Sequence, residues 1–269
     1  MSETPFHEKV VIITGASAGI GKALALKLAE QKAWLALAAR REEALQDVAD
    51  ACEQMGGMAT VVPTDVGVED QCRHLINEAV NAYGRIDALV NNAGITTYTM
   101  FEDVEDLSMM EKIIRVNYFG SVYCTYYALP HLKKTAGLIV GISSLSGKTG
   151  VPTRAFYSAS KHAMAGFFDS LRIELKGTGV GVTMIYPGFV KSDIRKQALG
   201  SDGQIIGTSH ISEQGIMSAA ECADIVIDAM AKRKRQVVMT TRGKIAQWIK
   251  LIAPRVVDNI ARRAIERGR

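Results

Sequence analysis

The chain has 269 residues, of which 48% are hydrophobic and 22% are charged, which is the composition of a globular protein with a full core. No apolar run of roughly 18 residues occurs and the first residues lack an apolar leader, so neither a membrane span nor a signal peptide is predicted. The net charge of +4 is uneven, because residues 242–269 hold eight Lys or Arg against two acidic residues. We therefore expect a cytoplasmic protein with a basic tail and no nucleic-acid partner.

Strand and helix patterns alternate along the chain. Each strand candidate is hydrophobic throughout, as expected of a strand that is covered on both faces. Strands are predicted at residues 10–14, 34–39, 59–63, 88–92, 137–143, 181–186 and 236–240, with helices such as 20–32, 41–55, 69–83, 107–133 and 153–176. This alternation predicts an α/β fold, namely a doubly wound, seven-stranded parallel sheet of Rossmann type in a single domain, residues 1–241.

Two segments break the alternation. Residues 189–217 follow a strand, contain several glycines and are too long for an ordinary connection, which is typical of a substrate loop. Residues 242–269 read as a basic amphipathic helical extension that is interrupted at Pro254. Its apolar stripes predict packing on the body or on a second subunit, and the alternative is a peripheral contact with an anionic membrane.

The four cysteines and five histidines show no CxxC pair, cluster or ligand spacing. We expect buried thiols and no metal site.

The first predicted strand runs directly into the sequence TGASAGIG, residues 14–21, and then into a helix. Glycines at 15, 19 and 21 allow a tight turn, close approach of a pyrophosphate, and presentation of the helix N-terminus to phosphate charge. A glycine pattern alone is a weak signal, but the strand before it and the helix after it supply the context that a dinucleotide-binding loop requires.

The spacing of these glycines resembles that of the short-chain dehydrogenase/reductase family, and the other family motifs follow in order. They are TDV at 64–66, NNAG at 91–94, YSASK at 157–161, and YPGFVKS at 186–192, where Ser192 replaces a threonine. The resemblance covers residues 9 to about 240. It implies that the cofactor is bound by Gly15, Ser17, Gly19, Ile20, Gly21, Asp65, Val66, Asn91, Ala93, Gly94, Tyr157, Lys161, Pro187, Gly188, Val190 and Ser192.

The end of the second predicted strand indicates which nicotinamide cofactor is used. NAD-specific enzymes place an acidic residue there, whereas this chain has Ala39 followed by Arg40 and Arg41. Guanidinium groups suit a 2′-phosphate, so NADP(H) is predicted. The alternative is that Arg40 and Arg41 begin a solvated helix and pair with Glu42 or Glu43.

Tyr157 and Lys161 lie four residues apart in a predicted helix, so their side chains share one face. We expect Lys161 to lower the pKa of Tyr157, which makes the phenol a general acid for carbonyl reduction. The resemblance adds Ser144, which would bond the substrate oxygen, and Asn117, which would hold a water beside Lys161. Ser143 and Ser146 stay open as alternatives to Ser144.

The expected reaction is hydride transfer between NADP(H) and a carbonyl or secondary alcohol. Segments 95–103, 145–154 and 189–217 predict a mostly apolar pocket for a hydrophobic ketone or aldehyde, whose candidate residues are Ile95, Tyr98, Met100, Phe101, Leu145, Val151, Pro152, Phe156, Phe189, Ile205, Ile206 and Met217. Residues 143–175 look like the 11β-hydroxysteroid dehydrogenase branch. The alternatives are a 3-oxoacyl carrier-protein reductase and a catalytically idle dinucleotide-binding module. The resemblance also implies a homodimer or homotetramer, paired through the helix at 156–168.

Overall fold

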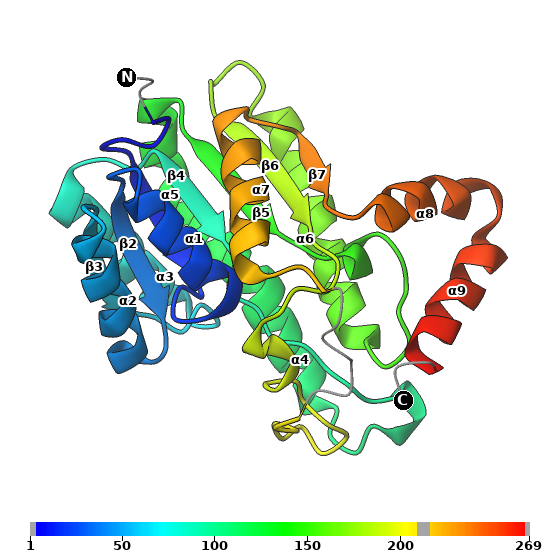
Figure 1. Ribbon diagram of the computed structural model, residues 1–269. Helices are drawn as coiled ribbons and strands as arrows, with labels where there is room; N and C mark the ends of the chain where they lie inside the picture. The colour runs from blue at the N-terminus through cyan, green and yellow to red at the C-terminus, as the bar shows by residue number, and fades with distance from the viewer. Residues whose placement is uncertain (1–3, 209–215, 267–269) are drawn as a thin grey trace.

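A computed structural model of the protein describes residues 4–208 and 216–266. Its centre is a parallel sheet with the strand order β3-β2-β1-β4-β5-β6-β7 (Figure 1). The strands are β1 Val10–Thr14, β2 Trp34–Ala39, β3 Met58–Pro63, β4 Ala88–Asn91, β5 Leu138–Ile142, β6 Gly181–Tyr186 and β7 Gln236–Val238. The predicted fold is confirmed. The strand order reverses between β1 and β4, and ligands of such sheets bind at this switch point, beyond the carboxyl ends of the strands.

Helices cover both faces of the sheet because successive strand residues point to opposite sides. Val11 and Ile13 of β1 pack under α1 Gly19–Ala29, α2 Glu42–Gln54 and α7 Ala219–Ala231. Ile12 packs instead in the cluster formed with α3 Glu69–Tyr83, α5 Gly120–Thr135 and α6 Ala155–Glu174. All four cysteines are buried free thiols, as expected.

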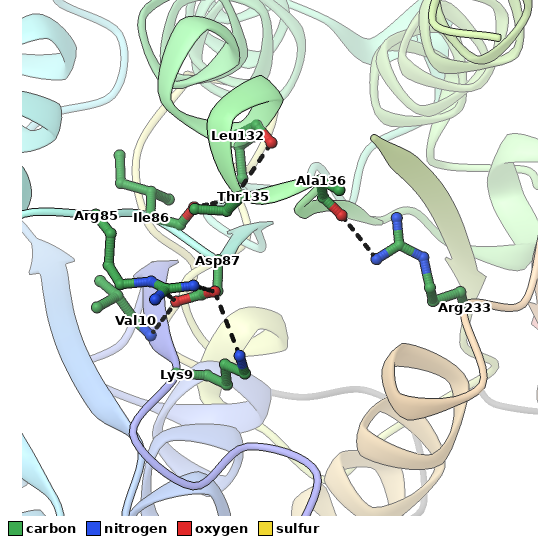
Figure 2. A network of polar contacts seen from close by, with 9 residues as sticks. All are labelled: Lys9, Val10, Arg85, Ile86, Asp87, Leu132, Thr135, Ala136 and Arg233. Atoms are coloured by element: carbon green, nitrogen blue, oxygen red, sulfur yellow. Dashed lines mark hydrogen bonds and ion pairs between the residues drawn. The ribbon is translucent and has the colours of Figure 1, made fainter. Parts of the chain in front are cut away.

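The amino ends of the strands are held by a polar network on the edge opposite the switch point (Figure 2). Asp87 accepts hydrogen bonds from the Val10 backbone at 3.0 Å and from Arg85 Nε at 2.9 Å. Arg233 donates to the carbonyls of Ala136 at 3.0 Å and Gly137 at 2.9 Å. These contacts satisfy backbone groups between elements, so this edge serves stability.

The helix expected at 107–133 is divided. It consists of α4 Ser108–Ile114, a π-helical turn at Arg115–Phe119 and α5. The Ser121 hydroxyl donates to the Asn117 carbonyl at 2.9 Å inside this turn. Single π turns within helices are frequent at functional sites, and this one contains a predicted catalytic residue.

The C-terminal segment forms α8 Thr241–Ile252 and α9 Pro254–Glu266, which project from the sheet at the β7 side (Figure 1). The Thr240 hydroxyl caps α8 by accepting a hydrogen bond from the Gly243 backbone at 3.0 Å. Lys250 Nζ donates to the Lys148 carbonyl at 2.8 Å and so ties α8 to the body. Within residues 4–208 and 216–266, no helix is both long enough and apolar enough to cross a bilayer.

Candidate active site

A cavity of about 1000 Å³ lies beyond the carboxyl ends of the strands. It runs from the glycine loop after β1, past the ends of β2 to β6, to the inner side of α8 and α9. The cavity is therefore at the place where a sheet of this topology binds its ligands.

At its three glycine positions, the loop after β1 leaves no room for a side chain. Gly15 and Gly19 have positive φ angles of 67° and 55°. A Cβ atom on Gly21 would lie 2.3 Å from the Gly15 carbonyl oxygen. The loop is held by Asn92, whose Nδ2 donates to the Thr14 carbonyl at 2.8 Å. This bare backbone at the start of α1 fits the pyrophosphate of a dinucleotide.

The end of β2 carries no carboxylate directed at the cavity. Ala39, Arg40 and Arg41 line the cavity there, and both arginines are exposed. Neither arginine forms an ion pair within the described residues, so the pairing with Glu42 or Glu43 that was considered above is not seen. Both guanidinium groups are available to an anion.

Most residues expected to bind the cofactor line the cavity. They are Gly15, Ser17, Gly19, Ile20, Arg40, Arg41, Asp65, Val66, Ala93, Gly94, Tyr157, Lys161, Pro187, Gly188, Val190 and Ser192. Gly21 does not line the cavity, but it packs against the backbone of Gly15 and so lets the loop close. Asn91 is different, because its side chain is buried and donates to Thr125 Oγ1 at 3.1 Å, so its amide faces α5. The neighbouring Asn92 lines the cavity instead.

Tyr157, Lys161 and Ser144 meet at one end of this cavity. Tyr157 is 6% exposed and Lys161 is 3% exposed, and Lys161 Nζ lies 5.8 Å from the centroid of the Tyr157 ring. Lys161 Nζ also donates a hydrogen bond to the Ile142 carbonyl at 2.9 Å. The spacing in α6 therefore brings the phenol and the ammonium onto one face, as predicted.

The serines after β5 have distinct surroundings. Ser144 lies close enough to Tyr157 to lower the pKa of its phenol, and its Oγ accepts a hydrogen bond from the Ser146 backbone at 3.1 Å. The Ser143 hydroxyl donates to the Lys161 backbone carbonyl at 3.4 Å, and Ser146 lies beyond, in the short turn Leu145–Gly147. Because Ser144 alone of the three acts on the phenol of Tyr157, its position favours it over Ser143 and Ser146.

The protonation of Tyr157 differs from the sequence expectation. Burial raises the pKa of Tyr157 above its usual value, while the charge of Arg154 and the hydrogen bond with Ser144 lower it. Burial also lowers the pKa of Lys161 to about 8. The expected fall in the tyrosine pKa is thus reversed in net direction, because desolvation disfavours the charged form of both groups. The cation that most opposes this rise is Arg154.

The buried ammonium of Lys161 is expected to cost stability that a methionine would recover. A pKa lowered from 10.5 to about 8 corresponds to about 3 kcal/mol. Since the folded state holds the proton less tightly, this cost is complete below pH 8 and vanishes as the pH rises past 10.5. Allowing for the lost bond to Ile142, Lys161→Met should raise the free energy of unfolding at pH 7 by about 1–3 kcal/mol.

This gain should shrink steadily in urea unfolding between pH 8 and pH 10. The matched control is Lys176→Met, at an exposed position, which should change stability little at any pH. A Lys161→Met protein less stable than its parent at pH 7 would show that the ammonium is not paying a desolvation cost.

Asn117 is fully buried in the π turn. Its Oδ1 accepts from the Ile95 backbone at 2.8 Å, and its Nδ2 donates to the Ile95 carbonyl and to Ser160 Oγ, each at 2.9 Å. A Cβ atom on Gly94 would lie 3.2 Å from Asn117 Oδ1 and 3.5 Å from Lys161 Nζ. Asn117 therefore ties the segment after β4 to α6, next to the Lys161 ammonium.

The expected substrate loop, 189–217, is anchored over much of its length. Leu199 forms isolated bridges with Thr97 and Ile205. The Tyr98 backbone donates to the Leu199 carbonyl at 2.9 Å. Residues 209–215 lie outside the described residues. Near its start, Ser192 faces the glycine loop, since a Cβ atom on Gly19 would lie 3.1 Å from Ser192 Cβ.

The apolar wall of the cavity was predicted only in part. Of the twelve candidate pocket residues, the cavity is lined by Ile95, Leu145, Val151 and Phe189. Sequence reasoning missed the wall formed by Ile245, Ile249, Val257 and Ile260 of α8 and α9. It also missed two buried arginines, Arg154 and Arg195, which line the cavity. Nothing in the sequence pattern marks an arginine as buried. In the described part of the chain, no cluster of metal-ligating side chains occurs.

Comparison with known proteins agrees with this geometry. A sequence profile described as short chain dehydrogenase matches residues 9–202. The chain belongs to the short-chain dehydrogenase family. It is therefore an oxidoreductase of a family that uses a nicotinamide dinucleotide and small-molecule substrates, and the resemblance of the sequence motifs is confirmed.

Relatives match over nearly the whole chain. An 11-beta-hydroxysteroid dehydrogenase-like 4A protein of Arabidopsis thaliana is 41% identical over 93% of this chain and 82% of its own. An 11-beta-hydroxysteroid dehydrogenase A of Arachis hypogaea is 38% identical over 93% of this chain and 73% of its own. An alcohol dehydrogenase of Thermococcus sibiricus, solved in complex with 5-hydroxy-NADP, has a TM-score of 0.72 and 26% identity, covering 82% of this chain and 89% of that one.

Proposed function

We propose that this short-chain dehydrogenase transfers hydride between NADP(H) and a hydrophobic carbonyl compound or secondary alcohol. The observation that carries the proposal is the meeting of buried Tyr157 and Lys161 with half-buried Ser144 in the cavity that begins at the glycine loop. The apolar wall and the steroid-dehydrogenase-like relatives support a hydrophobic substrate. The two exposed arginines at the end of β2 support NADP(H) over NAD(H).

In this proposal the protein's own residues handle the proton. The nicotinamide, when bound, supplies or accepts the hydride. Tyr157 donates its phenolic proton to the carbonyl oxygen, and Ser144 stabilises the charge that develops on that oxygen. The burial that raises the pKa of Tyr157 keeps the phenol protonated at neutral pH, which suits the acid needed for reduction.

Lys161 and Asn117 are proposed to restore the proton. Both amide hydrogens of Asn117 are already bonded, so a water at this place would be held by its oxygen or by the backbone of the π turn. Such a water would connect the Lys161 ammonium to solvent. The closeness of both groups to Gly94 supports this relay.

The test is to incubate the protein with NADPH or NADH and a panel of ketones, aldehydes and secondary alcohols, following the absorbance of the reduced nicotinamide. Turnover with NADPH is expected. If no compound is turned over with either cofactor while both cofactors bind, the protein is an idle dinucleotide-binding module. Preference for acyl thioesters would instead indicate a 3-oxoacyl carrier-protein reductase.

We also propose that the chain assembles through exposed apolar surfaces. On α8, Trp248 is 67% exposed and Ile252 is 89% exposed. A second surface, on α5 and α6, includes Tyr126 and Ile173, at 70% and 72%. If these side chains join into contiguous apolar patches, they would suit contact with a second subunit. The tail is basic and the rest of the chain is slightly acidic, which supports packing of α8 and α9 on a second subunit.

Placing charges on α8 should break this contact. The double variant Trp248→Glu, Ile252→Glu is expected to lower the mass measured by light scattering to that of a smaller assembly. The control Met55→Glu, at a 42% exposed site after α2, should keep the parental mass. If the mass stays unchanged and the double variant loses co-sedimentation with anionic liposomes that the parent shows, the surface binds membrane instead.

A further inference from the structure

Arg154 is a buried cation that the proposed proton chemistry leaves unused. The residue is only 8% exposed and lines the cavity. Its Nε atom is buried without a hydrogen-bond partner. Within residues 4–208 and 216–266, the guanidinium forms no ion pair or hydrogen bond. A buried charge without a counter-charge is unfavourable, so an anion in the cavity would stabilise this guanidinium.

The surroundings of Arg154 aim it at the reacting end of the cavity. Its Cζ atom lies 5.9 Å from the centroid of the Tyr157 ring and 5.8 Å from that of Phe189. Arg154 is also the N-cap of α6, where the helix dipole favours negative charge. The preceding Thr153 has a positive φ of 65°, and its carbonyl is held by the Thr99 backbone at 3.1 Å. The guanidinium of Arg154 thus lies between the rings of Tyr157 and Phe189.

Among the described residues, no carboxylate forms an ion pair with Arg154. Among the described residues that line the cavity, the only carboxylate assigned is Asp65, at the end of β3, whereas Arg195 lies close enough to lower the pKa of Arg154. Within the described lining of the cavity, the guanidinium of Arg154 therefore lacks a counter-charge.

That anion is not the phosphate expected at Arg40 and Arg41. Those arginines follow β2, whereas Tyr157 meets Ser144 just after β5, and β1 and β4 lie between the two strands. Three strand spacings amount to about 14 Å. One phosphate cannot reach both places, so the group that Arg154 binds is not the phosphate held by Arg40 and Arg41.

We propose that Arg154 binds a carboxylate of the substrate, which makes the substrate an oxo acid or the corresponding hydroxy acid with an apolar body. This inference rests on the proposed function and specifies its substrate class. The short path from the guanidinium to the Tyr157 ring places the carboxylate a few bonds from the reacting carbonyl. The planar fork of the guanidinium matches a carboxylate in a bidentate arrangement.

The experiment compares 3-benzoylpropionate, an aryl oxo acid, with its uncharged methyl ester. With NADPH, the parent should reduce the acid with a kcat/KM about 10- to 100-fold above that of the ester, as one charged hydrogen-bonded contact predicts. Arg154→Met should abolish this preference, because the acid then loses its contact with the guanidinium whereas the ester has no such contact to lose. Arg154→Lys, which keeps the charge but loses the fork, should restore part of it.

Equal losses for acid and ester in Arg154→Met, with a shifted pH profile, would overturn the inference, because Arg154 would then act only on the pKa of Tyr157. A parent that prefers the ester would also overturn it.

A binding measurement separates this inference from the proposed reaction. In Tyr157→Phe protein loaded with NADPH, calorimetry should give a Kd for the acid at least tenfold below that for the ester, and Arg154→Met should remove the difference. Selective binding of the acid by a parent that turns over nothing would support the anion site while refuting the reaction. Turnover of esters and acids alike, without selective binding of the acid, would support the proposed reaction and refute the anion site at Arg154.

Discussion

Tyr157→Phe is expected to lower kcat for carbonyl reduction by about 10²–10⁴-fold, the range that a positioned general acid contributes. Phenylalanine fills the same buried volume, so the fold should persist. The loss arises because the carbonyl oxygen then receives no proton, while Ser144 still offers a hydrogen bond. Steady-state kinetics with the best ketone of the panel measure the effect. Fluorescence titration of NADPH should show binding within a few-fold of the parent.

The matched control is Tyr126→Phe, which removes a phenolic hydroxyl from a side chain of α5 that is 70% exposed. It should leave kcat unchanged. Ser144→Ala should fall between the two, because it removes one hydrogen bond to the developing charge and leaves the proton donor in place. A Tyr157→Phe protein that keeps more than a tenth of the parental kcat would exclude Tyr157 as the general acid.

The second large effect concerns cofactor choice at the end of β2. The triple variant Ala39→Asp, Arg40→Ser, Arg41→Ser is expected to shift the ratio of kcat/KM for NADPH over NADH by about 100-fold or more toward NADH. Each charge-assisted contact with a phosphate is worth about 1.5–3 kcal/mol. The new carboxylate would accept hydrogen bonds from the ribose and repel a 2′-phosphate. The ratio is measured with one carbonyl substrate at saturating concentration.

Arg73→Ser is the control for charge, since Arg73 is an exposed cation of α3 that pairs with Asp70 at 3.0 Å. It should not alter the cofactor ratio. Loss of NADPH activity without any gain in NADH activity would mean that the variant damages the loop. A parent that prefers NADH would contradict the assignment of Arg40 and Arg41.

The strand segments along the chain, the glycine loop and the partnership of Tyr157 with Lys161 were all predictable. Each depends on local periodicity: apolar runs for buried strands, glycine where backbone must pass close, and a spacing of four for one helix face. The π turn at Asn117 was not predictable, because the turn depends on bonds from Asn117 to Ile95 and Ser160, which come from distant segments.

The sequence by itself determined the fold, the family and the glycine loop, and most of the site residues that it predicts line one cavity. The tertiary structure alone decided how deeply those groups are buried and which other groups they contact. Burial, which no motif records, raises the pKa of Tyr157, lowers that of Lys161 and leaves Arg154 as an unpaired cation in the cavity wall. Likewise, only long-range packing sets Asn91 against α5, brings Asn92 under the loop and adds α8 and α9 to the wall. Motifs specify which side chains are present, whereas desolvation sets their pKa values and long-range contacts set their orientation.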